Sequence, residues 1–357
     1  MRPILLSALL LPTLALASPV VIAAREGANL QRPVWSEDGE KISWEANFHD
    51  KKQIELWVGE PGGDHATQVR RSSQSTGLTA GFAAPSTGGV VHELSWAPAA
   101  IGHFVYAAST DQADYDLFID GASALSPAPG ADGSPAWSPD GRYIAFTSAR
   151  TGQGDLYLID VRAVEAPPRQ LTTAPESSEI FAAWSADSAS LAWVGHSPGG
   201  DSLWLLDTLN GAPHQLSGPK GEQTRPSWAP TGRKLAWYQA AEQGFDLYVA
   251  DLGGAGTPAL VARDVVLNAT GPTWTPDGQH LITVLDDDDR YDPVVAVRAA
   301  DPSKVTTLAL GTVGHGDLDV ARRADGALWI AYVAQGAATG GDRDFKRLYL
   351  APLPALP

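Results

Sequence analysis

Polar and charged residues of mixed type stand three and four positions before a series of recurring tryptophans. Those tryptophans are Trp35, Trp96, Trp137, Trp184, Trp228 and Trp274. If the residues before them converge, their carboxylate, guanidinium, imidazole and amide groups would form the kind of mixed polar site that holds a ligand. With their near neighbours, the candidate ligand- or partner-binding residues are Gln31, Arg32, His92, Glu93, Glu179, Arg225, Asn268, His315 and Asp317.

An enzyme is the alternative that these residue types leave open. A metal-dependent or lactonase-like hydrolase would need a bound metal or a general acid–base pair. The residues suited to those roles are His92, Glu93, Glu179, His315 and Asp317. No three-histidine pattern stands out, which argues against zinc. Hydrated filling between structural units is a further alternative. We expect binding rather than catalysis and assign no catalytic residue.

A dense acidic run is the candidate metal site. It reads DDDDRYD and carries the carboxylates of Asp286, Asp287, Asp288, Asp289 and Asp292. Because Ca²⁺ binds several carboxylate or carbonyl oxygens at about 2.4 Å, the run offers suitable ligands. It lacks the glycine and spacing of an EF-hand loop, and a solvated hairpin tip is the alternative. Ca²⁺ is therefore the cofactor that the sequence suggests, and no other is indicated.

One short segment matches the G-x-S-x-G pattern of hydrolase nucleophiles. It is GHSPG, Gly195–Gly199. That chemistry needs the serine on a strained turn from a strand into a helix. Here the segment lies between two predicted strands, Leu191–Val194 and Ser202–Asp207, and no helical pattern follows it. We therefore predict a hairpin loop and treat the match as a coincidence.

The elements that position these residues form a repeat, whose clearest copy is PAWSPDGRYIAFTSARTGQGDLYLID, Pro135–Asp160. Successive copies are 41 to 48 residues apart, except for a first spacing of 61, and Arg322 replaces the tryptophan of a seventh copy. A period in the forties with about four short strands is typical of a β-propeller, an all-β ring of four-stranded antiparallel blades. The tryptophan at the end of each first strand should pack between blades. Seven third strands predict seven blades, with six as the alternative.

We expect a single β-propeller domain over residues 18–357, because no blade can bury both faces alone. The predicted blades cover approximately 31–72, 92–128, 133–175, 180–218, 224–264, 270–311 and 316–353. The last copy has no fourth strand, and the strand-like segment 19–25 has no blade of its own. We expect that N-terminal strand to close the last blade, which would remove the open edge. The first spacing is long because of residues 72–91, a loop that is either filler or a partner contact.

The motif W-S-P-D-G-x-x-I-A-F, followed by D-L-Y-x-x-D, resembles the repeat of TolB-type propellers. The match is strongest in Pro135–Asp160 and good in Pro226–Asp251 and Pro272–Val297. The resemblance implies a propeller in the bacterial cell envelope that binds or scaffolds other molecules, since TolB is a periplasmic protein of the Tol–Pal system. TolB proteins also carry an α/β domain before a six-bladed ring, for which we expect no room here, so orthology is not implied.

The N-terminal segment and the composition indicate where the protein is located and which partners are disfavoured. Residues 1–17 have one cation and a short apolar run, which predicts a signal peptide cleaved near Ala17–Ser18. The sequence has no cysteine, hence no disulfide and no lipid-modified cysteine. With 25 Lys and Arg against 41 Asp and Glu, the net charge of −16 disfavours nucleic acid and anionic membranes. We expect a periplasmic or secreted protein without a transmembrane segment, whose partner is a protein, small molecule or glycan. Its oligomeric state stays open.

Overall fold

The computed structural model describes most of the chain. The described residues are 19–51, 53–62, 66–71, 91–109, 115–120, 124–173, 175–216, 221–286, 292–337, 345–353 and 355–357, with the backbone alone for 13–15, 70–71, 91–92, 109 and 337. Within them the fold is built from short strands and two 3₁₀ turns, η1 (His49–Lys51) and η2 (Val161–Ala163). None of the helical segments among these residues has the length and apolar character needed to cross a membrane.

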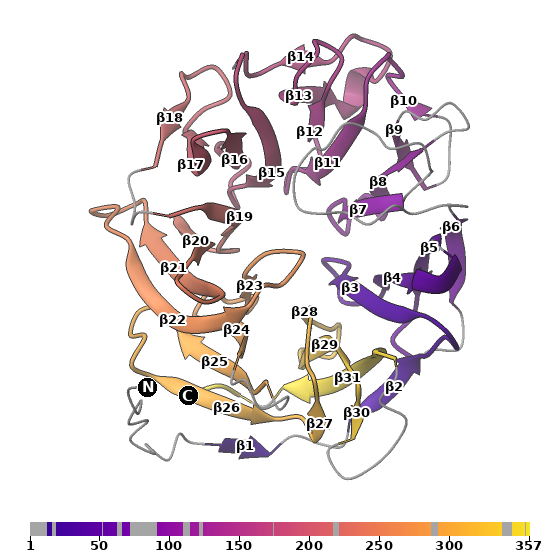
Figure 1. Ribbon diagram of the computed structural model, residues 1–357, viewed down its shortest axis with the longest axis vertical. Coiled ribbons are helices and arrows are strands. Elements are labelled where there is room, and N and C mark those ends of the chain that lie inside the picture. The colour runs from indigo at the N-terminus through magenta and orange to yellow at the C-terminus, as the bar shows by residue number, and fades with distance from the viewer. Residues whose placement is uncertain are drawn as a thin grey trace.

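Four-stranded antiparallel sheets surround a central axis, as the sequence predicted for a β-propeller (Figure 1). Four of them follow the chain in order. Their strands are β3 (Asn29–Trp35), β4 (Ile42–Phe48), β5 (Gln53–Gly59) and β6 (Thr67–Arg71); β7 (Val91–Trp96), β8 (Phe104–Ser109), β9 (Tyr115–Ile119) and β10 (Ala124–Leu125); β11 (Asp132–Trp137), β12 (Tyr143–Ser148), β13 (Asp155–Asp160) and β14 (Arg169–Gln170); β15 (Ser178–Trp184), β16 (Leu191–Ser197), β17 (Gly200–Leu206) and β18 (His214–Gln215). The first strand of each lies nearest the axis and the fourth lies at the rim.

Two further groups of four strands are joined into one larger sheet. Their strands are β19 (Gln223–Trp228), β20 (Lys234–Ala240), β21 (Phe245–Asp251) and β22 (Ala259–Val266); β23 (Thr273–Trp274), β24 (His280–Leu285), β25 (Val294–Arg298) and β26 (Val305–Ala309). The link between the groups is the pairing of Val265 and Val266 in β22 with Leu285 and Val284 in β24. Strand β1 (Thr13–Ala15), from the predicted signal peptide, runs parallel to β26 at the outer edge.

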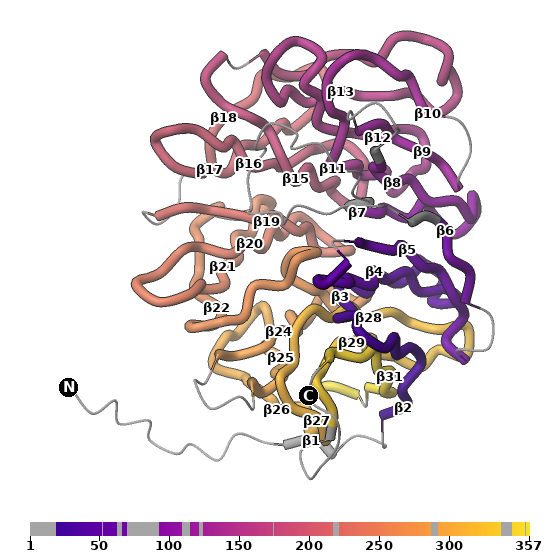
Figure 2. Tube along the Cα trace, turned by 45° about the vertical axis from the view of Figure 1, so that its right-hand side comes forward, coloured from indigo at the N-terminus to yellow at the C-terminus, as the bar shows by residue number. Residues whose placement is uncertain are grey.

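The last four-stranded sheet combines strands from distant parts of the chain. Its order is β28 (Leu318–Arg322), β29 (Leu328–Ala334), β31 (Arg347–Leu353) and β2 (Val20–Ala23). Val20 pairs with Leu350 and Val21 with Tyr349, so the N-terminal strand forms the outer edge of the sheet (Figure 2). A small ladder of β27 (Thr312–Val313) and β30 (Gly336–Ala337) lies beside it.

The turn after four of the first strands is fixed by a short hydroxyl–carboxylate motif. In the clearest repeat, the Ser138 hydroxyl donates to Asp140 Oδ1 at 2.6 Å, and the same oxygen accepts the Arg142 N–H. Gly141 completes the turn with a φ of 73°, in the left-handed region that glycine adopts without a Cβ penalty. The same hydroxyl–carboxylate bond occurs at Ser36, Ser185 and Thr275. The repeated sequence therefore builds one repeated turn.

Packing between sheets uses the recurring tryptophans, as expected. Four of them donate their indole N–H to the carbonyl just before the tryptophan position of the preceding sheet. The pairs are Trp96 with Val34, Trp184 with Ala136, Trp228 with Ala183 and Trp274 with Ser227, at 2.9 to 3.2 Å. Buried aliphatic and aromatic residues of adjacent sheets surround these contacts. Four pairs of neighbouring sheets are thereby joined near the axis.

Candidate functional site

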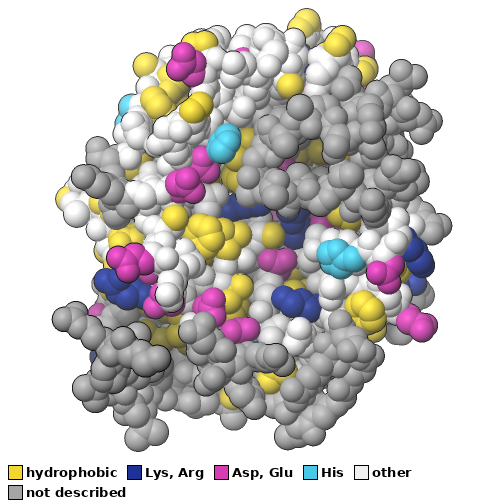
Figure 3. All heavy atoms as spheres, in the orientation of Figure 1, with side chains coloured by type: hydrophobic (Ala, Val, Ile, Leu, Met, Phe, Trp, Pro, Cys, Tyr) yellow, Lys and Arg dark blue, Asp and Glu magenta, His cyan; other side chains and the backbone are white. Residues whose placement is uncertain are grey.

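The first strands enclose a central cavity of about 520 Å³. Its polar lining includes Arg32, Glu45, Glu93, Ser134, Arg225 and Thr270, and its apolar lining includes the edges of several tryptophans and prolines together with Phe181. We call this space the channel cavity. Basic and acidic side chains lie together at the centre of the face shown in Figure 3. The volume falls in the range of small-molecule sites.

A shared backbone distortion directs residues into the channel cavity. The residue three before each recurring tryptophan has a left-handed backbone, with φ between 48° and 56° at the five positions that are not glycine. They are Arg32, Glu93, Ser134, Phe181 and Arg225, and Gly271 holds the sixth position at 102°. The strand pairing shifts register at the first five. Left-handed backbone costs a non-glycine residue about 1 to 2 kcal/mol, and such strain is characteristic of functional sites.

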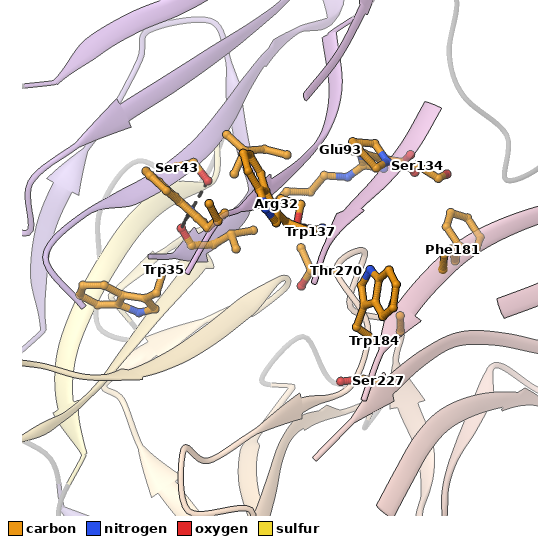
Figure 4. A pocket seen from close by; sticks show the side chains of 18 of the residues that line it. Arg32, Trp35, Ser43, Glu93, Ser134, Trp137, Phe181, Trp184, Ser227 and Thr270 are labelled. Carbon is orange, nitrogen blue, oxygen red and sulfur yellow. Dashed lines mark hydrogen bonds between the residues drawn. The ribbon is translucent and has the colours of Figure 1, made fainter. Parts of the chain in front are cut away.

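These five side chains all line the channel cavity and come from five different sheets. Figure 4 shows the labelled side chains of Arg32, Ser134, Phe181 and Thr270 around one open space. In a β-bulge the extra residue leaves the ladder and its side chain is redirected. The bulges therefore turn what would be sheet positions into a ring of side chains around the axis.

Arg32 and Glu45 form the most enclosed charge pair of the cavity. Arg32 Nη1 lies 3.4 Å from Glu45 Oε1, and Gln31 Nε2 donates to Glu45 Oε2 at 2.8 Å. Burial raises the pKa of Glu45, and the charge of Arg32 and the Gln31 bond only partly oppose it. Burial would lower the pKa of Arg32, but Glu45, Glu93 and Asp317 outweigh it and raise that pKa. The pair therefore favours the charged form of Arg32, whereas burial disfavours the charged form of Glu45.

Arg225 is held differently. Its guanidinium lies 3.6 Å over the ring of Phe181, a cation–π contact. Its nearest carboxylate is that of Glu93, with 3.9 Å between Nη1 and Oε1. Strands β19 and β7, which carry these two residues, face each other across the ring in Figure 1. Burial lowers the pKa of Arg225 to about 10, although Glu93 opposes the shift. Burial therefore outweighs the stabilisation that Glu93 gives to this cation.

Asp317 ties the wall of the cavity together instead of facing its centre. Its Oδ2 accepts the backbone N–H of Arg32 at 2.9 Å, and its Oδ1 accepts the backbone N–H of Ala269 at 2.8 Å. Both partners are backbone groups of residues that line the cavity. The carboxylate thus positions Arg32 and the segment before β23.

The remaining candidate residues are placed outside the channel cavity. Glu179 is buried, accepts the hydroxyls of Ser177 and Thr172, and has a pKa raised to about 7 by burial, against those bonds. Asn268 donates to Thr273 Oγ1 and to the carbonyl of Leu318. The imidazole of His315 is buried between Thr312 Oγ1 and the carbonyl of Asp292. The side chain of His92 lies outside the described part of the chain.

The structure leaves the predicted metal site undescribed for the most part. Of the acidic run, Asp287, Asp288 and Asp289 lie outside the described residues, as does the 72–90 loop. Asp286 donates its backbone N–H to the carbonyl of Asp264. Among the described residues, no group of three or more His, Cys, Asp or Glu side chains is placed to hold a metal ion. The Ca²⁺ hypothesis therefore stays a prediction.

The G-x-S-x-G match lies in a hairpin, as predicted. Strands β16 and β17 pair down to Ser197 and Gly200, and the Ser197 hydroxyl donates to the Gly200 carbonyl at 3.0 Å. His196 pairs with Asp201 instead, at 2.5 Å, on the exposed side of the hairpin. No strand-to-helix turn exists there, so the nucleophile geometry is missing.

Among the lining residues that were not candidates, Glu45 and Phe181 contact the two arginines of the cavity. Glu45 belongs to the second strand of its sheet, and its one signal is that it is the only charged residue in the run ISWEANF. Phe181 stands at the recurring position but is apolar, so its contact with Arg225 was not expected from residue type. A search for charges that interrupt apolar strands would have found Glu45.

Comparison with known proteins agrees with the fold. No family model matches the chain. It is 32% identical over 107 residues to a TolB homologue of Chlorobium chlorochromatii, over 30% of this chain and 23% of that protein. It is 30% identical over 174 residues to dipeptidyl-peptidase 5 of Aspergillus fumigatus, over 46% of this chain and 20% of that protein. The matched part thus spans less than a quarter of either relative.

Solved structures give the same fold at low identity. TolB from Acinetobacter baumannii superposes with a TM-score of 0.52 at 14% identity, over 75% of this chain and 63% of that one. A puromycin-hydrolysing peptidase of Mycobacterium tuberculosis gives 0.62 at 16% identity, over 91% of this chain and 52% of that one. Together with the repeat and the described sheets, these comparisons show a β-propeller fold whose repeat is similar to that of TolB-type propellers.

Proposed function

We propose that the protein is an exported binding module of the bacterial cell envelope, which holds a protein segment or a small ligand in the channel cavity. One observation carries this proposal. Five sheets place a strained, non-glycine residue at the same repeat position, and all five side chains reach one cavity. Packing alone does not require that strain, because glycine at the same position would relieve it. Two features support the envelope role: the TolB-like repeat and the signal peptide predicted for residues 1–17.

The ring is proposed to have seven blades within a single domain of residues 18–357. The larger sheet counts as two blades, because only two residue pairs of β22 and β24 join its halves, whereas each half has its own first, innermost strand. The pairing of β2 with β31 supports closure of the last blade by the N-terminal strand. Such closure would lock the ring without a disulfide.

A second candidate is a role next to peptidase chemistry. The likeness to two proteins named as peptidases favours it, with this propeller holding peptides while another chain or domain carries the catalytic groups. Catalysis in the channel itself has less support. Of its candidate groups, Glu179 and His315 are buried away from the cavity in hydrogen bonds of their own. A general acid–base pair is therefore not assembled from the described candidates.

Thermal-shift measurements with defined probes test the proposal. The panel contains free amino acids and short peptides, mono- and disaccharides, and simple carboxylates and phosphates. Ser134→Trp fills the cavity, and the aromatic Phe181 at the equivalent position shows that the backbone accepts a ring there. Glu165→Trp, at an exposed turn, is the control. We expect at least one class to raise the Tm of the wild type and the control but not of Ser134→Trp. Equal shifts in all three proteins, or none, would refute the proposal.

A further inference from the structure

We infer that the channel cavity takes a ligand that carries an ammonium group and a carboxylate close together, with Arg225 receiving the carboxylate and Glu93 the ammonium. The ligand class is a free α-amino acid or a very short peptide. This inference rests on the proposed function, since it specifies what the same cavity binds.

The charges of the cavity divide into a bonded set and a loosely held pair. Glu45 has close partners in Arg32 and Gln31, and Asp317 accepts two backbone N–H groups. The contact between Arg225 and Glu93 is 3.9 Å long. Within the described residues neither of these two side chains makes a hydrogen bond. Arg225 can therefore still donate hydrogen bonds to a ligand, and Glu93 can still accept them.

The contact with Phe181 prepares Arg225 for a carboxylate. The ring holds the guanidinium by its face at 3.6 Å, and a guanidinium stacked by its face keeps its N–H groups at the edges. Those edges match the two oxygens of a carboxylate, which they bind in a bidentate manner. The pKa of Arg225, lowered by burial, is consistent with a cation that gains from a closer anion. An aromatic platform is also apolar, so it would contact an apolar part of the ligand.

Charge balance selects a ligand with both groups. A ligand that is only an anion would pair with Arg225 and leave Glu93 with only the charge of Arg32, which Glu45 already binds. A ligand that is only a cation would do the reverse. Leaving one member of an enclosed ion pair uncompensated is costly. An ammonium and a carboxylate in one molecule replace both partners at once, because the ligand inserts into the 3.9 Å gap as the pair opens.

The rest of the lining suits the remainder of such a ligand. The hydroxyls of Ser134 and Thr270 face the same space, and Trp35, Trp137 and Trp184 expose edges to it. An apolar side chain would lie against these edges and Phe181. The volume of about 520 Å³ admits an amino acid or a dipeptide.

Calorimetric titration with four probes tests the inference on the full chain. The probes are L-phenylalanine, N-acetyl-L-phenylalanine, L-phenylalanine amide and the dipeptide of two phenylalanines. We expect either L-phenylalanine or the dipeptide to bind at least tenfold more tightly than the acetylated and amidated forms. The stronger of the two tells whether a free amino acid or a peptide fits. Equal binding of the acetylated form, or no binding by any probe, overturns the inference.

Variants assign the two roles. Arg225→Gln should remove the preference over the amide, and Glu93→Gln should remove the preference over the acetylated form. Each variant should bind the probe that lacks the corresponding group as the wild type does, which also shows that it is folded. Arg162→Gln, at an exposed position, should keep both preferences. Variants that keep both preferences would contradict the assignment.

The two proposals fail separately. If saccharides or simple anions shift the Tm of the wild type but not of Ser134→Trp, while the phenylalanine series shows no preference for the zwitterion, binding in the cavity stands and this inference is wrong. If no probe of either panel distinguishes the wild type from Ser134→Trp, both are wrong.

Discussion

Asp317 and Arg32 stand 285 positions apart in the chain, and Asp317 Oδ2 accepts the backbone N–H of Arg32 at 2.9 Å. The other carboxylate oxygen accepts the backbone N–H of Ala269 at 2.8 Å. One side chain therefore joins three segments of the ring beside the channel cavity. Because Arg32 has a strained left-handed backbone, this bond helps to hold it there.

Asp317→Ala should destabilise the protein by about 2 to 4 kcal/mol. The substitution leaves two enclosed backbone N–H groups without an acceptor, and each costs about 1 to 3 kcal/mol. Urea denaturation followed by tryptophan fluorescence measures the change in the free energy of unfolding. Asp325→Ala is the matched control, because Asp325 accepts a single N–H, from Ala327, in an exposed turn. Similar losses in both variants would show that Asp317 does not fasten the ring.

Removal of residues 19–25 tests closure of the ring. Compared with a chain that starts at Ser18, the shortened chain should lose many degrees of Tm, since it exposes the edge of β31 and the apolar residues beneath β2. Ile22 and Ala23 pack on the core between the first and last sheets, and Arg25 stacks on Trp57 at 3.8 Å. Scanning calorimetry gives the two Tm values. An unchanged Tm would mean that β2 is not needed for closure.

The architecture could be predicted from the sequence because the repeat reports on it directly. The clearest copy spells a tryptophan-ended strand, a turn with Asp and Gly, and apolar strands. Strands β12 and β13 lie within Pro135–Asp160, whereas β11 begins three residues before it, at Asp132. The tryptophans were also correctly assigned to packing, since repetition makes a structural role visible. The strands at the rim of the ring were harder to predict. Strands β10, β14 and β18 have only two residues each, too few for a periodic pattern.

The site was only partly predictable, because sequence position does not give side-chain direction across a ring. Counting three residues back from each tryptophan found Arg32, Glu93 and Arg225, which line the cavity. Their closeness to these positions in the sequence also suggested Glu179 and His315. The side chains of both form hydrogen bonds within the wall and do not line the cavity. The left-handed backbone carries no composition signal here, since arginine, glutamate, serine and phenylalanine all adopt it. Contacts such as that of Arg225 with Glu93 depend on which sheets face each other.

Stability should fall as the pH rises from about 4.5 to 7. Burial raises the pKa of Glu179 to about 7 and the pKa values of Asp132 and Asp319 to about 6. The folded state therefore binds more protons than the unfolded state in this window, and raising the pH removes that advantage. For Glu179 the effect is on the order of 3 kcal/mol, at about 1.4 kcal/mol per pKa unit.

Glu179→Gln should flatten this pH dependence. The amide is neutral at every pH, so the variant should gain stability over the wild type at pH 8 and differ little at pH 4.5. Urea denaturation at both pH values gives the comparison. Glu176→Gln removes an exposed carboxylate three residues away and should leave the slope unchanged. If Glu179→Gln kept the slope of the wild type, the buried carboxyl would not be the titrating group.

Trp184→Phe should cost more stability than Trp35→Phe, although both tryptophans are buried at the same repeat position. The Trp184 indole N–H donates to the Ala136 carbonyl of the preceding sheet at 2.9 Å. The Trp35 indole N–H has no acceptor among the described residues, although the preceding sheet holds Ala321 at the position equivalent to Ala136, next to the Arg322 that replaces the tryptophan. Both substitutions remove similar apolar area, so the difference isolates the bond between sheets. We expect about 1 kcal/mol by urea denaturation, and equal losses would show that packing alone joins the sheets.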